Sequence, residues 1–286
     1  MFEYNETLEQ ALRRNVEDAL REDIGCADWT AQLAPSAKRV QARVVAKEDA
    51  VIAGQPWFEA CILRLDPNAA VEWLVAEGGS IAAGAEVCRI AGSARALLSA
   101  ERSALNFLQM LSAVATVTRR YVEKISGVSP NPGGCAILDT RKTMPGLRQA
   151  QKYAVRVGGG ANHRMALWDG ILIKENHIAA AGGVREAMER ARSLGAGVPV
   201  QVEVEDLGEL EEALAAGATS ILLDDFSFDD MKRAVALNDG RALLEVSGGV
   251  DLDSLRAIAA TGVDRISSGK LTKDVRAIDL SMRVDA

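Results

Sequence analysis

Apolar residues follow two different patterns in the first half of the chain. Leu, Ala and Val recur at helical spacing over residues 7–23, which predicts an amphipathic helix, and over residues 93–126, which predicts one long helix or two abutting ones. Short β-type runs lie between them, at residues 40–46, 51–53, 71–75 and 87–90. Together these patterns predict a small α/β domain at the start of the chain.

The turns of this first domain are rich in glycine. The pattern around Gly78, Gly79 and Gly84 resembles the half-barrel of biotinyl and lipoyl carrier domains. A carrier needs a lysine on the turn, and no lysine lies between Lys47 and Lys124. We therefore expect a structural domain of the half-barrel or hammerhead type.

A different alternation begins after the Pro and Gly cluster at residues 130–134. Short β-rich runs now alternate with helical segments, as in a parallel sheet. The runs cover residues 136–139, 170–173, 199–204, 220–223, 243–247 and 265–267, with helical patterns at 207–215, 228–236 and 252–259. We predict an α/β fold with a closed or incomplete TIM-like barrel, and an open doubly wound sheet is the alternative.

Composition limits the possible partners. The net charge is -7 over 286 residues, whereas nucleic-acid binding needs a basic surface, so nucleic acid is not expected as a partner. No apolar run approaches the roughly 18 residues of a membrane helix. Met1 to Asn5 has no secretory-signal pattern, so we predict a cytoplasmic protein without membrane contact. The four cysteines are widely spaced, which indicates reduced, mostly buried thiols.

Positive charge is concentrated in one segment of this acidic chain. Between Asp139 and His177 there are seven Lys or Arg residues against three acidic ones, together with both histidines of the protein. A basic pocket in an acidic protein is typical of a site for a small, multiply anionic ligand.

In a parallel barrel the active site lies at the carboxyl ends of the strands. The predicted strands end in Thr140-Arg141-Lys142, Lys174, Glu203, Asp224, Ser247-Gly248-Gly249 and Ser267-Ser268-Gly269. Alternation along the strands directs the side chains of Glu203, Asp224 and Glu245 into the barrel, where carboxylates need cations, a metal or water. The alternative is that Glu203 and Asp224 only cap the helices that follow.

Three glycine-rich turns stand near these residues. Those at 247–249 and 268–269 follow the last two strands and precede predicted helices, which suits a phosphate-binding cradle, although ordinary turns are the alternative. The turn at 158–160 precedes His163 and Arg164. We interpret it as a flexible loop that moves these two side chains over a ligand, with a tight structural turn as the alternative.

Several ordered motifs across nearly the whole chain resemble the quinolinate phosphoribosyltransferase family. They are Thr140-Arg141-Lys142-Thr143, Pro145-Gly146-Leu147-Arg148, Asn162-His163-Arg164, Lys174-Glu175-Asn176-His177, Glu203-Val204-Glu205, Leu222-Leu223-Asp224, Glu245-Val246-Ser247-Gly248-Gly249 and Ser267-Ser268-Gly269. The resemblance implies an amino-terminal α/β domain at residues 1–115, joined by the tail at 275–286, and an incomplete barrel at 116–274. It also implies a homodimer, or an assembly of dimers, with shared active sites. Trp29 stands where the family would have a smaller aliphatic residue, which concerns loop packing.

The resemblance implies the reaction of quinolinate with phosphoribosyl pyrophosphate to give nicotinate mononucleotide, CO2 and pyrophosphate. Arg102, Arg141, His163, Arg164 and Lys174 would bind the carboxylates of quinolinate. Without the resemblance, the favoured interpretation is that Arg102 belongs to a solvated helix face with Asn106 and Gln109.

The other substrate would occupy the remaining strand ends. By the same resemblance, Lys142 faces its phosphates, and the turns at 247–249 and 267–269 hold its 5'-phosphate. Thr140 is a further expected substrate-binding residue. Glu203 and Asp224 would stabilise an oxocarbenium ion and hold Mg2+ together with the substrate phosphates. The expected catalytic residues are Glu203, Asp224, Lys142 and Lys174.

Three other functions remain open at this point. One is a related phosphoribosyltransferase, either associated with molybdenum transport or acting on another pyridine acid. A second is a Schiff-base aldolase, because Lys174 lies at a strand end beside a phosphate cradle. The third is a non-catalytic barrel that binds an anionic regulator, which would not need inward carboxylates.

Overall fold

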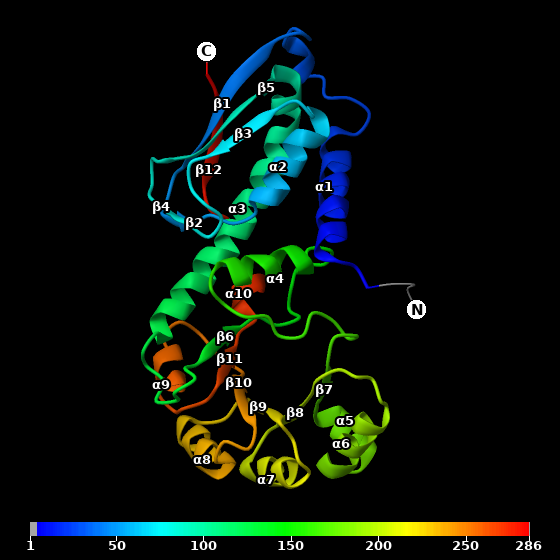
Figure 1. Cartoon of the computed structure of the whole chain (residues 1–286), viewed down its shortest axis with the longest axis vertical. Coiled ribbons are helices and arrows are strands. Elements are labelled where there is room, and N and C mark those ends of the chain that lie inside the picture. The colour runs from blue at the N-terminus through cyan, green and yellow to red at the C-terminus, as the bar shows by residue number, and fades with distance from the viewer. Residues whose placement is uncertain (1–4, 286) are drawn as a thin grey trace. The chain divides into compact units, whose positions relative to one another are not determined.

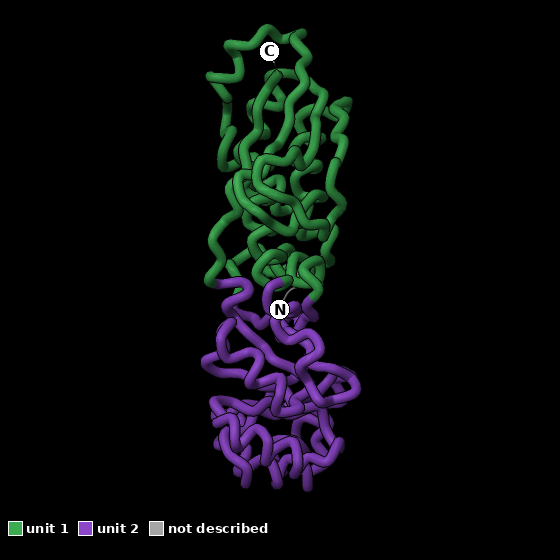
Figure 2. Tube along the Cα trace, turned by 90° about the vertical axis from the view of Figure 1, so that its left-hand side faces the viewer, with its two compact units in different colours: residues 1–119, 143–159, 274–286 green, residues 120–142, 160–273 purple. Residues whose placement is uncertain are grey.

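The structure is a computed structural model that describes residues 5–285. Residues 1–4, to which part of the prediction of cytoplasmic location refers, and residue 286 lie outside the described residues. The chain forms two compact units, drawn in different colours in Figure 2. Unit 1 comprises residues 1–119, 143–159 and 274–286, and unit 2 comprises residues 120–142 and 160–273.

Unit 1 is built on a four-stranded antiparallel sheet with the order β12-β1-β5-β3. Its strands are β1 (Arg39–Ala46), β3 (Ala70–Trp73), β5 (Glu86–Ser93) and β12 (Leu280–Val284), and β2 (Ala50–Val51) pairs separately with β4 (Ser80–Ile81). β12 pairs with β1 over five residues, from Ala42 opposite Val284 to Ala46 opposite Leu280. The carboxyl-terminal segment therefore completes the sheet of the first unit.

The helices that begin in unit 1 are α1 (Leu8–Ile24), α2 (Gln55–Leu65), α3 (Ala94–Ile125) and α4 (Arg148–Val157), with a short 3-10 turn at Ala31–Leu33 (Figure 1). α1 starts at the predicted place because Thr7 and Gln10 form a capping box. The segment predicted as one or two helices is a single helix of 32 residues, α3. Its apolar stripe is fully buried at Leu97, Leu105, Leu108 and Leu111.

Unit 2 holds a six-stranded parallel sheet with the order β6-β11-β10-β9-β8-β7. Its strands are β6 (Ala136–Leu138), β7 (Ile171–Ile173), β8 (Val200–Val204), β9 (Ser220–Asp224), β10 (Leu243–Ser247) and β11 (Arg265–Ser267). Neighbouring strands follow chain order from β7 to β11, and β6 then pairs with β11. This is the order of a barrel left open between β6 and β7, so the incomplete barrel is confirmed and the doubly wound alternative is wrong.

The helices that begin in unit 2 follow the strands: α5 (Glu175–Ala181), α6 (Val184–Ser193), α7 (Leu207–Ala215), α8 (Phe228–Asn238), α9 (Leu255–Ala259) and α10 (Lys270–Lys273). Figure 1 shows α5 and α6 side by side after β7, and α7 and α8 beside the strands β8 and β9. Asp206 caps α7 and Ser227 caps α8 through their side chains. Glu203 and Asp224 are therefore not the caps of these helices, which excludes the capping alternative.

Two simpler predictions concern membranes and cysteines. Among residues 5–285, no helix has the length and apolarity needed to cross a lipid bilayer. All four cysteines are free; Cys61 and Cys88 are buried, Cys135 is half-buried, and Cys26 is exposed. Burial raises the pKa of Cys61 and of Cys88 to about 12, which keeps both as unreactive thiols.

Candidate active site

A lysine and a glutamate form an ion pair at the carboxyl ends of two adjacent strands of unit 2. Lys174 directly follows β7, and its Nζ lies 2.8 Å and 2.7 Å from Oε1 and Oε2 of Glu203 on β8. Glu203 is only 6% exposed, and it shares a face of β8 with Gln201, which bonds to Glu245 on β10, two strands away, as the predicted inward direction requires. Burial raises the pKa of Glu203, and the charges of Asp224 and Glu175 raise it further, while Lys174 opposes the shift.

The guanidinium of Arg164 lies within electrostatic range of Glu203 and of a second guanidinium, that of Arg141. Burial lowers the pKa of Arg164, the nearby charge of Arg141 lowers it further, and Glu203 opposes both. The Nη1 atom of Arg164 also donates to the carbonyl oxygen of Gly170 over 3.0 Å. Like charges that approach one another in a partly buried place favour the binding of an anion.

The segment that carries His163 and Arg164 is fastened to β6. Ala161 forms an isolated parallel bridge with Leu138, and the backbone amide of His163 donates to Oδ1 of Asp139 over 3.0 Å. Asp139 is fully buried and also accepts a hydrogen bond from the side chain of Asn162. The strand end thus holds the cationic segment directly.

The turn at 158–160 differs from its predicted role at Gly158. A Cβ at Gly158 would lie 2.6 Å from the carbonyl oxygen of Ala115 and 2.7 Å from Cβ of Thr118, so α4 and α3 approach too closely there for a side chain. Gly158 also ends α4 by donating to the carbonyl oxygen of Ala154. The tight structural turn therefore describes Gly158, and the flexible-loop interpretation is wrong for it.

The predicted phosphate cradle contains two closely packed glycines. Gly248 has φ of +88°, and a Cβ there would lie 2.1 Å from Oδ1 of Asp225, the residue after β9. A Cβ at Gly269 would lie 2.9 Å from Cδ of Lys142. The Oγ1 atom of Thr272 donates to the carbonyl oxygen of Lys142 over 2.8 Å. The loops after β6, β9, β10 and β11 therefore meet around these glycines.

The cradle differs in two details from its prediction. α10 begins directly after Gly269, but α9 begins only at Leu255, so the turn at 247–249 does not open directly into a helix. Ser267 and Ser268 are each 4% exposed, and the hydroxyl of Ser268 accepts a hydrogen bond from the amide of Lys270. These two serines are therefore largely internal.

Replacing Gly248 by alanine is expected to lower the free energy of unfolding by about 2 kcal/mol, because the new Cβ overlaps Asp225 and the left-handed backbone disfavours a side chain. Urea unfolding measures the change. Gly240→Ala is the matched control, since Gly240 has φ of +71° with open space at the Cβ position. Its expected cost is about 1 kcal/mol. Equal losses in the two variants would contradict the proposed steric contact.

Arg102 belongs to unit 1. It is exposed on α3 and lines a cavity of about 400 Å³, with α1 and residues 145–147 forming other parts of the wall. Asn106 lines the same cavity, while Nε2 of Gln109 donates to the carbonyl oxygen of Leu280 over 3.2 Å. The predicted helix face therefore divides into an exposed part and a part that binds the carboxyl-terminal strand. Trp29 is 75% exposed and thus packs little in its loop.

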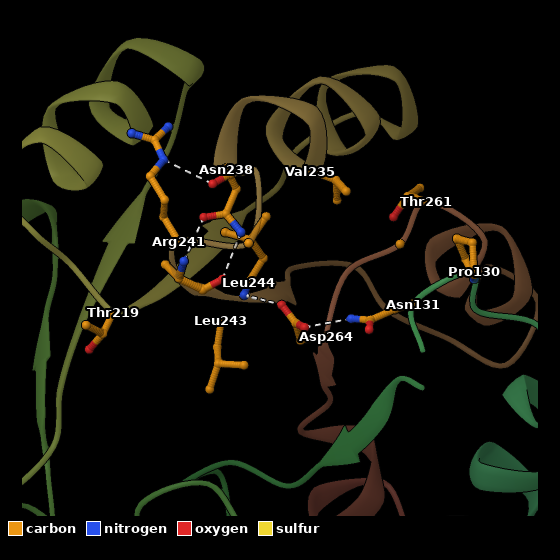
Figure 3. A pocket seen from close by; sticks show the side chains of 13 residues that line it. Pro130, Asn131, Thr219, Val235, Asn238, Arg241, Leu243, Leu244, Thr261 and Asp264 are labelled. Atoms are coloured by element: carbon orange, nitrogen blue, oxygen red, sulfur yellow. Dashed lines mark hydrogen bonds between the residues drawn. The ribbon is translucent and has the colours of Figure 1, made fainter. Parts of the chain in front are cut away.

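Unit 2 contains a cavity of about 500 Å³ at the amino ends of β10 and β11 (Figure 3). Its polar groups already bind one another. Asp264 accepts from Nδ2 of Asn131 over 2.7 Å and from the amide of Leu244 over 2.7 Å, and Asn238 exchanges two hydrogen bonds with Ala242. These polar groups are bound to other groups of the protein, and they lie at the opposite strand ends from Lys174. We therefore interpret this cavity as structural.

Three polar residues around the site were not among the predicted site residues: Asp139, Asn162 and Gln201. Asp139 and Asn162 hold the segment of His163, and Gln201 hydrogen bonds to His163 and Glu245. The sequence did contain a signal for Gln201, because it shares the inward face of its strand with Glu203. The partners of Asp139 could not be read in this way, since they lie on a loop.

The acidic residues do not form a metal-binding cluster by themselves. Among residues 5–285, no group of three His, Cys, Asp or Glu side chains is placed to hold a metal ion. Both oxygens of Glu203 bind Lys174, whereas Asp224 is partly exposed at the end of β9. A divalent cation would thus need oxygen ligands from a bound molecule in addition to Asp224.

Comparisons with known proteins agree with this arrangement. The profile of the quinolinate phosphoribosyl transferase N-terminal domain matches residues 28–112, and that of the C-terminal domain matches residues 114–283. A protein of Bacillus subtilis named "Probable nicotinate-nucleotide pyrophosphorylase [carboxylating]" is 42% identical over 92% of this chain and 90% of its own length. A nicotinate-nucleotide pyrophosphorylase [carboxylating] of Mycobacterium leprae is 39% identical over 95% of this chain and 96% of its own.

The solved structures extend the likeness to three dimensions. The nicotinate-nucleotide pyrophosphorylase from Francisella tularensis matches with a TM-score of 0.92 and 44% identity, and the match covers 98% of each chain. Both domain profiles, the curated relatives and this structure agree over nearly the full length. The chain therefore belongs to the quinolinate phosphoribosyltransferase family.

Proposed function

We propose that this chain transfers the phosphoribosyl group of phosphoribosyl pyrophosphate to quinolinate, giving nicotinate mononucleotide, CO2 and pyrophosphate for NAD biosynthesis. The relatives named above supply the reaction. The observation that carries it to this site is a buried carboxylate, Glu203, paired with Lys174 and near the guanidinium of Arg164. Such a site combines cations for an acidic substrate with a negative charge for a cationic intermediate.

The cations would bind the dicarboxylate. Arg141 and Arg164 offer planar, bidentate donors, and Lys174 offers a compact charge. We place His163 in the same pocket because it precedes Arg164, and we place Arg102 there by the family resemblance. An incoming carboxylate would relieve the repulsion between Arg141 and Arg164 and would compete with Glu203 for Lys174.

The carboxylates would act on the sugar. Loss of pyrophosphate leaves positive charge on the ribose ring, and Glu203 and Asp224 would stabilise that charge as a preorganised field. Thr140 and Lys142 would face the phosphates, with the backbone of residues 247–249 and 267–269 at the 5'-phosphate. Asp224 and Glu203, together with the substrate phosphates, would hold Mg2+, which would supply positive charge to the leaving pyrophosphate.

The decarboxylation needs no further cofactor. Once the pyridine nitrogen is joined to the ribose, its positive charge stabilises the electron pair that departing CO2 leaves on the adjacent ring carbon, and that carbon then takes up a proton from water. Lys174 and the two arginines would hold the remaining carboxylate in place. The test of the whole proposal is to mix the purified chain with quinolinate, phosphoribosyl pyrophosphate and Mg2+. Nicotinate mononucleotide should form, and Lys174→Ala should abolish its formation; no product from the unmodified chain would refute the proposal.

Two of the alternative functions conflict with specific observations. A Schiff-base aldolase needs a neutral amine as its nucleophile, whereas Lys174 is in an ion pair with both oxygens of Glu203. A non-catalytic anion-binding barrel does not need inward carboxylates, and both Glu203 and Glu245 are buried inside the barrel. A phosphoribosyltransferase for another acid is tested by screening substrates.

Nicotinate is expected to replace quinolinate poorly, with kcat/KM lower by about a hundredfold or more, because one carboxylate is missing and part of the half-buried cation cluster then lacks the anion it would bind. The same assay serves both acids, since both would yield nicotinate mononucleotide. Measurement at a fixed, saturating concentration of phosphoribosyl pyrophosphate isolates the effect of the acid. Comparable values would contradict the assignment of Arg141, Arg164 and Lys174 to two carboxylates.

We further propose a homodimer, or an assembly of dimers, with shared active sites, and a cytoplasmic location. The family resemblance supports the dimer. The cytoplasmic location stays the prediction made from the sequence.

A further inference from the structure

A chain of hydrogen bonds runs through the interior of the barrel behind Arg164. The backbone amide of Arg164 lies 2.8 Å from Nδ1 of His163, and Nε2 of the same ring lies 2.9 Å from Oε1 of Gln201. The Nε2 atom of Gln201 lies 3.0 Å from Oε2 of Glu245. Three side chains from a loop, β8 and β10 are thereby connected in series.

The groups at the two ends of this series determine which atom donates in each hydrogen bond. A backbone N–H only donates, so Nδ1 of His163 accepts and holds no proton. The proton of the ring is then on Nε2, which donates to the carbonyl oxygen of Gln201. The amide nitrogen of Gln201 in turn donates to Oε2 of Glu245, because an amide NH2 group only donates. The geometry thus assigns His163 as a neutral ring with its proton on Nε2.

The burial of Glu245 lowers the stability of the fold. It is 1% exposed, and among the described residues no hydrogen-bond donor serves its Oε1, which lies 3.5 Å from Nε2 of His163. A buried carboxylate without full compensation destabilises the fold relative to an apolar side chain. Its position is therefore better explained by its effect on His163 than by a gain in stability.

This series of hydrogen bonds holds the backbone of Arg164 in place. The amide of His163 is bound to Asp139, the amide of Arg164 is bound to the His163 ring, and Nη1 of Arg164 is bound to Gly170. His163, Arg164, Gln201 and Glu245 all line one cavity of about 600 Å³ in unit 2. Without the ring, the Arg164 amide would lose its acceptor and the segment would lose one of the contacts that hold it.

We propose that Glu245 and Gln201 are positioning residues of the active site, which lock His163 as a neutral Nε2–H ring so that its Nδ1 fixes the backbone of Arg164. His163 then contributes no positive charge to the dicarboxylate pocket, and the charge comes from Arg141, Arg164 and Lys174. This proposal deepens the proposed function, on which it rests for the identity of the substrate.

The tautomer can be observed without any activity assay. The protein contains two histidines, so nitrogen NMR of the full chain with isotope-labelled histidine shows two rings, and His177→Asn assigns them. Near neutral pH, His163 should give one protonated and one unprotonated nitrogen, with the proton on Nε2. A doubly protonated ring, or a proton on Nδ1, would overturn the proposal even if the enzyme proves fully active.

Substitutions at the far end of the chain test the positioning role. Glu245→Gln keeps an oxygen that accepts from Gln201, so the tautomer and the kinetics should stay close to those of the unmodified enzyme. Glu245→Leu removes the acceptor, and KM for quinolinate should rise about ten- to a hundredfold while KM for phosphoribosyl pyrophosphate stays nearly constant. The His163 spectrum should also change in this variant.

If Glu245→Leu does not fold, Gln201→Met interrupts the same series of hydrogen bonds at another residue. It should also raise KM for quinolinate selectively and change the His163 spectrum. If both breaks leave KM for quinolinate and the spectrum unchanged, Glu245 and Gln201 are only structural. If the unmodified enzyme forms no nicotinate mononucleotide while the tautomer is as assigned, the proposed function fails and the hydrogen-bond assignment stands.

Discussion

Glu203→Gln is expected to lower turnover at saturating substrates by about a hundredfold or more, the size seen when one preorganised electrostatic group is removed from a transition state. Glu203 is 6% exposed, so its charge acts on the ribose through a poorly screened medium. The positive charge it stabilises exists mainly near the transition state. The loss should therefore fall on kcat.

Binding of quinolinate should respond differently to the same substitution. In the free enzyme Glu203 holds Lys174 through both carboxylate oxygens, and the amide of glutamine would hold it less strongly. Lys174 then becomes more available to a substrate carboxylate, so the dissociation constant of quinolinate should stay equal or fall. Calorimetry of binding, paired with steady-state kinetics, separates the two effects.

The control for this experiment is Glu211→Gln, the same chemical change on the exposed surface of α7. It should leave both turnover and quinolinate binding unchanged. If Glu203→Gln instead weakens binding and leaves turnover at saturation intact, Glu203 is a binding residue and its proposed role in stabilising the ribose cation is incorrect.

Mixing two inactive variants, Arg102→Ala and Lys174→Ala, is expected to restore about a quarter of the unmodified activity if Arg102 enters the site of a partner subunit. Arg102 belongs to unit 1 and Lys174 to unit 2. After exchange, about half of the two-fold dimers are mixed, and each mixed dimer has one site with both lesions and one with neither. Activity then comes from the intact sites alone.

The matched control mixes Lys174→Ala with Lys142→Ala, because both residues belong to unit 2. Every site in that mixture carries a lesion, so no activity should return. Native mass spectrometry confirms that exchange has occurred. Absence of recovery in the Arg102 mixture, with exchange complete, would show that each site is built within one chain.

Much of the fold could be predicted because its signals are local. The capping box at Thr7 and Gln10 begins α1, and the spacing of apolar residues identified α3 and all six strands of the barrel. Helix α2 was missed because Gly54, the residue before it, offers no side chain to cap the helix. Strand β12 was not identified from its pattern either, since an edge strand becomes visible only when its partner β1 is known.

The sequence by itself determined which residue types stand at the strand ends and which of them face inward, because alternation with a period of two depends only on the backbone. It thereby placed Glu203 and Glu245 inside the barrel before any partner was known. The motif set also determined the family. These conclusions need order along the chain and no contact between distant segments.

Tertiary structure alone decided what those side chains bind. Lys174 and Glu203 are 29 positions apart, and His163, Gln201 and Glu245 come from three separate segments, so their pairing depends on how the strands are arranged around the barrel. The same holds for residues 143–159, which belong to unit 1 although both flanking segments belong to unit 2. The hydrogen-bond partners of the His163 ring likewise follow from atoms brought together in space, and no spacing along a sequence encodes them.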